Sequence, residues 1–85
     1  MDTVLTEIQK ITLKDILTTS GLKQRQVEDI FLLLSFKPER VQLAFYYRAC
    51  GETYEWIGEV LNTPRRTVND WVNINCVDIC MYLKG

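Results

Sequence analysis

The sequence has no histidine, few glycines and prolines, and no excess of basic residues. Histidine is the commonest general base and a common zinc ligand, so its absence removes the usual starting point for catalysis or a metal site. The chain also has no glycine-rich phosphate loop, and neither a nucleophile–base pair nor a carboxylate pair at a recognisable spacing. We therefore expect no enzyme and no cofactor.

Long apolar runs are also missing. The longest, around residues 31–34, is far shorter than the roughly 20 residues that a membrane-spanning helix needs. The N-terminus carries Asp2 and Glu7 and shows no basic segment before an apolar core, which a secretory signal would require. These features predict an intracellular, cytoplasmic protein without a membrane partner.

Cysteine is scarce and odd in number: Cys50, Cys76 and Cys80. Four nitrogen or sulfur ligands, which a structural zinc ion requires, are too many for one copy of this chain to supply. We expect no metal, and interpret the cysteines as small apolar residues kept reduced in the cytosol. A metal or a bridge shared between two copies is the alternative.

The 85 residues, 47% of them hydrophobic, are enough for one small domain spanning 1–85. Apolar residues recur at helical spacing, which predicts an all-α, compact bundle of five or six helices. We divide it into an N-terminal helical platform, 1–36, and a C-terminal part, 37–85. The net charge of −1 and a pI near 5.3 are unusual for a domain that binds through phosphates.

The N-terminal platform has an apolar stripe in residues 1–11, formed by Val4, Leu5, Ile8 and Ile11. Residues 12–15 resemble a capping signal, so a new helix could start there or the first helix could continue with a kink. Ser20-Gly21 predicts the end of this helical segment. Residues 22–35 predict a central core helix. Pro38 predicts the start of another helix, which Gly51 ends.

The stretch Tyr54–Asn73 has the pattern of two short helices joined by a tight turn. Gly58 is placed where the helices would cross, and Asn62 suits the left-handed conformation that ends a helix. Thr63 and Pro64 then read as an N-cap and a first helical residue. Spacing and turn chemistry agree on a helix-turn-helix. Its expected core contacts are Ile57, Gly58, Leu61, Val68 and Trp71, with Tyr47 nearby.

The residues from Arg40 to Trp71, with Glu52-Thr53-Tyr54-Glu55-Trp56-Ile57-Gly58 leading into Thr67-Val68, resemble region 4 of sigma-70-type transcription factors. The resemblance extends over roughly residues 27–83. It implies a recognition helix that reads double-stranded DNA, and RNA polymerase or another transcription protein as a further partner.

In this register the second helix begins with outward polar residues. A recognition helix presents such residues to base edges in the major groove. Arginine pairs with guanine in bidentate fashion, asparagine suits adenine, and threonine suits phosphate; an aspartate could accept from cytosine or orient an arginine. The candidate DNA-binding residues are Arg65, Arg66, Thr67, Asn69, Asp70, Asn73 and Thr53.

Because the chain is slightly acidic, one copy should bind DNA weakly, and we expect a homodimer or a partner protein. A rival hypothesis follows from Glu52, Glu55 and Glu59, which suit a basic protein surface: a protein-interaction module of the transcription apparatus. A phage or plasmid protein for DNA packaging or replication would use the same motif. Trp56 or Tyr54 could stay exposed to dock a partner, although packing is the simpler role.

Two alternatives of structure also stay open. Ile16, Gly21, Val27 and Ile30 recur 41 positions later as Ile57, Asn62, Val68 and Trp71, so residues 13–32 could form a second helix-turn-helix or simply a supporting platform. Residues 74–83 fit a strand or a helix. We favour a long recognition helix that runs on into this tail, because neither glycine nor proline interrupts it.

Overall fold

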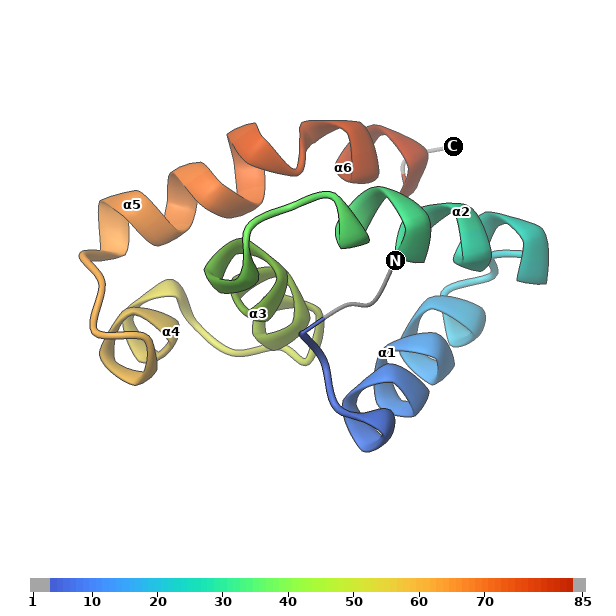
Figure 1. The fold of residues 1–85 in the computed structure, drawn as a ribbon, viewed down its shortest axis with the longest axis horizontal. Helices are drawn as coiled ribbons and strands as arrows, with labels where there is room; N and C mark the ends of the chain where they lie inside the picture. The colour runs from blue at the N-terminus through green and yellow to red at the C-terminus, as the bar shows by residue number, and fades with distance from the viewer. Residues whose placement is uncertain (1–3, 84–85) are drawn as a thin grey trace.

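The structure, a computed structural model, describes residues 4–83, and all secondary structure within them is helical. The all-α prediction is confirmed, with six α-helices in this part of the chain (Figure 1). They are α1 (Glu7–Thr19), α2 (Gln24–Ser35), α3 (Glu39–Ala49), α4 (Tyr54–Val60), α5 (Arg65–Asp70) and α6 (Val77–Leu83), and a π-helical turn, η1 (Trp71–Asn75), separates α5 from α6.

The first helix starts later than its apolar stripe suggested. The Thr6 hydroxyl accepts the Gln9 backbone N–H, and the Gln9 side chain accepts the Thr6 N–H, which closes a capping box. With α1 in this register, Leu13 and Leu17 face the core, while Ile8 and Ile11 are 76% and 60% exposed. The predicted inward stripe of residues 4–11 is therefore wrong for both isoleucines. The helix also continues unbroken through residues 12–15.

Three of the turns between helices share one geometry. Gly21, Gly51 and Asn62 each have a positive φ, of 98°, 96° and 52°. The next residue donates its N–H to a carbonyl five positions back, as in Leu22 to Leu17 and Thr63 to Gly58. This is the hydrogen-bond pattern of a Schellman motif. The helix stops predicted at Gly21, Gly51 and Asn62 are confirmed.

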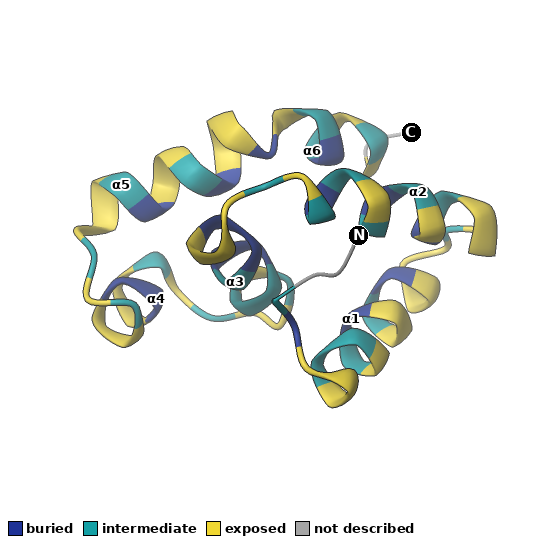
Figure 2. Cartoon of the chain, in the orientation of Figure 1, coloured by how far each residue is buried: buried dark blue, intermediate teal, exposed yellow. Residues whose placement is uncertain are grey.

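The core consists of two clusters that share α3. The first joins α1, α2, α3 and α6; the second joins α3, α4, α5 and η1. Figure 2 shows buried positions on the inner sides of the helices and exposed positions on their outer sides. The radius of gyration, 12.0 Å, is what a compact chain of this length should have. Since α6 packs in the first cluster, that cluster draws on both 1–36 and 37–85.

The tail is helical, but not as one straight helix. Val72, Cys76 and Ile79 are buried at helical spacing, whereas Val77 and Met81 of the alternating strand pattern are exposed. The helical ladder widens at η1 and breaks at Cys76, which has φ −106° and ψ 23°. The break turns α6 onto α2. Burial also raises the pKa of the Cys76 thiol to about 11, so this cysteine is a protonated core residue at neutral pH.

Polar contacts fasten the outer segments to this core. The buried Gln42 side chain accepts the Val4 N–H and donates to the Lys37 carbonyl. Lys37 pairs with Asp78 at 3.1 Å, and the Tyr82 hydroxyl donates to Asp29, so both contacts join α6 to the α2 region. Among residues 4–83, no helix combines the length and the apolar character that a membrane crossing requires.

Candidate nucleic-acid interface

The pair α4–α5 is held together by an unusually close backbone contact at Gly58. A Cβ atom at this position would lie 2.6 Å from the Thr63 carbonyl oxygen and 3.6 Å from the Arg65 nitrogen. Only glycine therefore fits without a shift of the backbone. The predicted close approach of the backbones at Gly58 is confirmed. Ile57 and Val68 close the contact from inside, both fully buried.

The turn between them differs from the sequence prediction by one residue. Pro64, with ψ of 142°, is the N-cap of α5, and Arg65 is the first helical residue. Thr63 is therefore not the N-cap; its hydroxyl donates to the Leu61 carbonyl. Arg40 of α3 donates both to that hydroxyl and to the same carbonyl. Arg40 thus fixes the turn, a role that sequence spacing does not reveal because the residues are far apart in the chain.

The helix α5 exposes most of the residues that the sequence singled out. Arg65, Arg66, Asn69 and Asp70 are exposed, Thr67 is half-buried, and Val68 anchors the opposite side. Within residues 4–83, neither arginine forms an ion pair. The two guanidinium groups therefore keep their hydrogen-bonding capacity for a ligand.

Asn73 is exposed too, but its amide is already engaged. Its nitrogen donates to the Tyr54 hydroxyl at 3.1 Å and to the backbone and side-chain oxygens of Asn69, at 3.0 and 3.1 Å. The Asn69 nitrogen and the Asn73 oxygen take no part in a hydrogen bond among the described residues. These two groups, one donor and one acceptor, are what the pair can offer to a base.

Thr53 is the N-cap of α4 and accepts the Trp56 N–H at 3.1 Å. Its hydroxyl hydrogen remains able to donate, so a phosphate contact is compatible with the cap. Arg48, at the end of α3, lies beside it. Its guanidinium carbon is 4.5 Å from the centre of the Tyr54 ring, and one nitrogen donates to the Glu52 carbonyl. The sequence offered no signal for Arg48.

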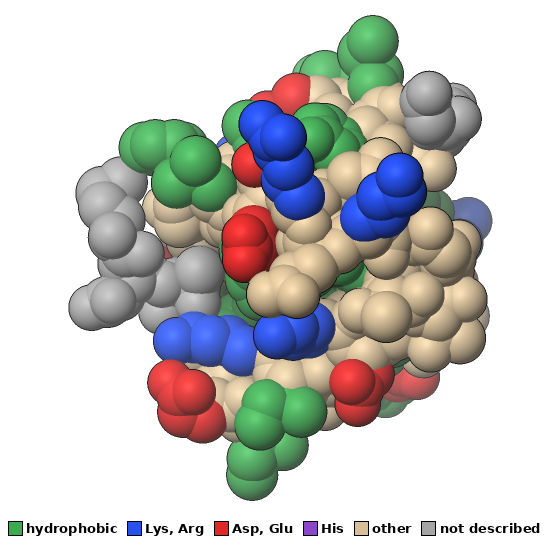
Figure 3. Space-filling view, turned by 90° about the vertical axis from the view of Figure 1, so that its right-hand side faces the viewer, with side chains coloured by type: hydrophobic (Ala, Val, Ile, Leu, Met, Phe, Trp, Pro, Cys, Tyr) green, Lys and Arg blue, Asp and Glu red, His purple; other side chains and the backbone are tan. Residues whose placement is uncertain are grey.

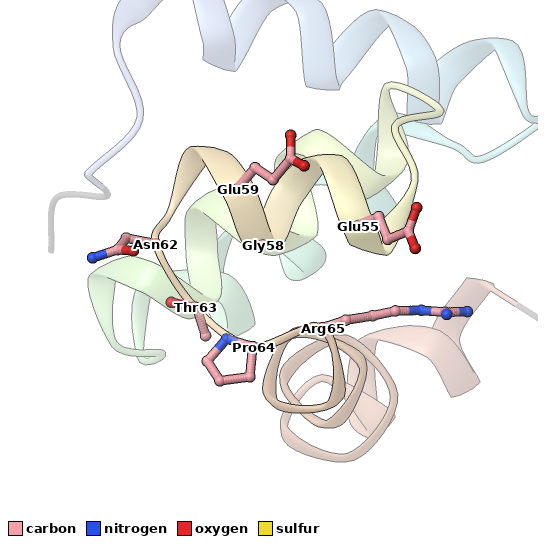
Figure 4. Close-up of a pocket in the computed structure, with 7 residues that line it drawn as sticks. All are labelled: Glu55, Gly58, Glu59, Asn62, Thr63, Pro64 and Arg65. Atoms are coloured by element: carbon pink, nitrogen blue, oxygen red, sulfur yellow. The ribbon is translucent and has the colours of Figure 1, made fainter.

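A shallow hollow between α4 and α5 brings acidic residues close to this surface (Figure 4). Glu55, Glu59 and Arg65 line it, together with the turn residues. In Figure 4 the Arg65 side chain extends away from Asn62 and Thr63, Glu55 points toward the same side of the molecule, and Glu59 points away from α5. The charge of the surface is therefore mixed: Glu55 and Glu59 line this hollow with Arg65, and Asp70 lines a further hollow with Arg65 and Arg66.

The tryptophans behave differently from each other. Trp71 is half-buried and packs against both core clusters, so it anchors the back of the helical segment without being enclosed. Leu61 and Tyr47, also expected in the core, are half-buried as well. Trp56 is 40% exposed and contacts the Tyr47 ring edge-on at 5.3 Å. Comparison with protein-family models, with curated proteins and with solved structures gives no significant match to this chain.

Proposed function

We propose that the protein is a sequence-specific DNA-binding regulator of transcription, in which α4, the turn and α5 act as a helix-turn-helix. The observation that carries this proposal is the position of Arg65 and Arg66, exposed on the outer side of a helix whose Val68 is buried. A helix held in this way can enter the major groove with its polar side toward the bases. The resemblance to sigma region 4 likewise implies that α5 is the recognition helix.

The contacts follow from the chemistry of the exposed groups. Arg66 pairs with the O6 and N7 acceptors of guanine, and the Asn69 nitrogen with the Asn73 oxygen suits the N7 and N6 groups of adenine. Thr53 and Thr67 contact phosphates beside the groove. Asp70, four residues after Arg66, orients that arginine or accepts from cytosine.

Binding by one copy should be weak, because the chain carries a net charge of −1. We propose that a homodimer, or RNA polymerase or another transcription protein, supplies the remaining affinity. Exposed apolar residues on η1 and α6, namely Ile74, Val77 and Met81, support an additional protein contact. Chromatography with light scattering, with and without a bound duplex, measures the stoichiometry.

The test begins with selection of target duplexes from a randomised double-stranded library. The selected duplex should bind with an affinity that falls steeply as salt is added. Arg66→Ala should lower that affinity roughly 5- to 150-fold, the loss of about 1–3 kcal/mol expected for one bidentate base contact, and leave the melting temperature unchanged. No enrichment of any sequence, or an Arg66→Ala variant that binds like the parent, would remove the proposal.

One observation favours a second candidate, a protein-interaction module of the transcription apparatus. The outer side of α4 carries Trp56 and Val60, both exposed, beside the acidic Glu55 and Glu59. Such a surface suits a basic partner protein better than DNA. This candidate predicts no measurable DNA binding, a stable complex with purified bacterial RNA polymerase, and loss of that complex in Trp56→Ala.

A further inference from the structure

A second hollow lies where the end of α3, the start of α4 and the start of α5 meet. Its lining residues are Arg48, Thr53, Tyr54, Glu55 and Arg65. The two arginines come from helices far apart in sequence, and both are exposed. Glu55 supplies one carboxylate to this lining and the arginines supply two guanidinium groups, so the hollow keeps a net positive charge.

Arg48 is held in place before any ligand arrives. Its guanidinium carbon lies 4.5 Å from the centre of the Tyr54 ring, and its Nη1 donates to the Glu52 carbonyl at 2.9 Å. The Tyr54 ring is itself fixed, since its hydroxyl accepts from Asn73 in the segment that continues α5. An arginine ordered in this way loses little side-chain entropy on binding, and it keeps further N–H groups to donate.

We propose that this hollow binds one backbone phosphate of DNA, beside the groove that holds α5. A phosphodiester carries one negative charge and presents oxygens that accept from two guanidinium groups at once. Thr53 and Tyr54 line the same hollow. Because Arg48 belongs to α3, off the reading helix, this contact sets the position of α5 in the groove and carries no sequence information.

The inference rests on the proposed DNA-binding function and adds to it a specific residue and a specific group on the DNA. Glu55 limits the site to a weakly charged ligand. Its carboxylate would repel the second charge of a free phosphate dianion more strongly than the single charge of a phosphodiester. The hollow should therefore prefer DNA over inorganic phosphate.

The experiment compares the full chain with Arg48→Ala, Arg48→Lys and Glu55→Gln, each titrated against the selected duplex and an unrelated duplex at several salt concentrations. Arg48→Ala should weaken binding to both duplexes by the same factor, roughly tenfold, as for the loss of one hydrogen-bonded charge. It should reduce the slope of log affinity against log salt by about one. Arg48→Lys should restore the slope but only part of the affinity, and Glu55→Gln should tighten binding.

A phosphate scan locates the contact. A neutral methylphosphonate at the phosphate that faces the hollow should weaken binding by the parent chain. At that position Arg48→Ala should show no additional loss. Melting curves of Arg48→Ala check that the lost hydrogen bond to the Glu52 carbonyl has not unfolded the chain, and Arg48→Lys provides the comparison if it has.

Three outcomes overturn the inference. If Arg48→Ala binds with the affinity and the salt slope of the parent while Arg66→Ala binds the selected duplex more weakly, the phosphate site is wrong and the proposed function stands. If Arg48→Ala changes sequence preference instead, the residue reads a base. If the parent chain binds no DNA at any salt concentration, both proposals fail.

Discussion

The pairs α1–α2 and α4–α5 are joined by the same turn but present different surfaces. Gly21 and Asn62 have positive φ at equivalent positions, and α2 and α5 both begin three residues after them. The sequence repeat at an offset of 41 is therefore also a repeat of backbone geometry. The turn that joins α3 to α4 through Gly51 shares it too. This turn chemistry consequently identifies a helix connection and says nothing of function.

The two helix pairs differ in how their helices pack against each other. Leu17 in α1 stands where α4 has Gly58, and its side chain is buried in the first core cluster. In α4 the glycine lets the turn and the start of α5 lie directly against the helix. The α1–α2 pair thus has a buried leucine at the position where the α4–α5 pair has a glycine in close contact with the turn.

The two helix pairs also differ in the residues on their outer sides. Arg25 and Asp29 of α2 correspond to Arg66 and Asp70 of α5, but Asp29 accepts the Tyr82 hydroxyl whereas Asp70 is exposed. Glu28 and Leu32 of α2 stand where the other pair has Asn69 and Asn73. Figure 3, which views the side of the molecule nearest α1 and the start of α2, shows acidic and basic side chains interspersed. This favours a supporting platform over a second reading unit.

The largest expected effect is at Leu17. Leu17→Ala removes a buried side chain from the first cluster and should cost about 2–5 kcal/mol, a large part of the stability of so small a domain. Urea unfolding measures it. Leu83→Ala, a leucine 39% exposed at the end of α6, is the control and should cost less than about 1 kcal/mol. If the two variants lose the same free energy of unfolding, the buried Leu17 side chain does not contribute to the core as proposed.

Gly58→Ala should come next. In an ordinary helix this change stabilises by roughly 0.5–1 kcal/mol, but here the added Cβ meets the Thr63 carbonyl and should cost about 1–3 kcal/mol. Chemical denaturation gives the sign directly. A stabilised variant would contradict the close approach of α4 and the turn.

Changes at the turns should be smaller. Gly21→Ala places a side chain at φ 98° and should cost about 1–2 kcal/mol, while Asn62→Gly relieves φ 52° and should change stability by less than about 1 kcal/mol. Thermal melts of the two variants, compared side by side, test whether the turns are equivalent. A large loss from Asn62→Gly would mean that the asparagine side chain has a role beyond its backbone conformation.

The smallest effect concerns pH. The hydrogen bond to Asp29 raises the pKa of Tyr82 above its ordinary value near 10. A pKa raised in the folded state adds stability that is complete below the ordinary pKa and is lost as pH rises through the raised one. Stability measured from pH 8 to 11 should therefore fall more steeply in the parent than in Tyr82→Phe. Identical curves would show that the hydrogen bond from Tyr82 to Asp29 does not stabilise the contact between α2 and α6.

The sequence predicted the helices and the turns well because both depend on local chemistry. Gly21, Gly51 and Asn62 stop helices through their own φ angles, and Pro38 opens α3 through its own ring. The predictions were wrong or incomplete where packing against residues distant in the chain determines burial and contacts. Ile8 and Ile11 are exposed, whereas Leu5, Leu13 and Leu17 contribute to the first core cluster, and the helix breaks at Cys76 so that α6 packs on α2. Arg40 and Arg48 act on segments that only the fold brings near.

The most direct measurement compares Arg66→Ala with Arg25→Ala, its counterpart in the α1–α2 pair, by fluorescence anisotropy with the selected duplex. Both changes remove one exposed arginine at the same position of the same motif, so they alter net charge equally. We expect Arg66→Ala to lose preference for the selected duplex while Arg25→Ala binds like the parent. Equal behaviour of the two variants would contradict the assignment of α5 as the helix that reads DNA.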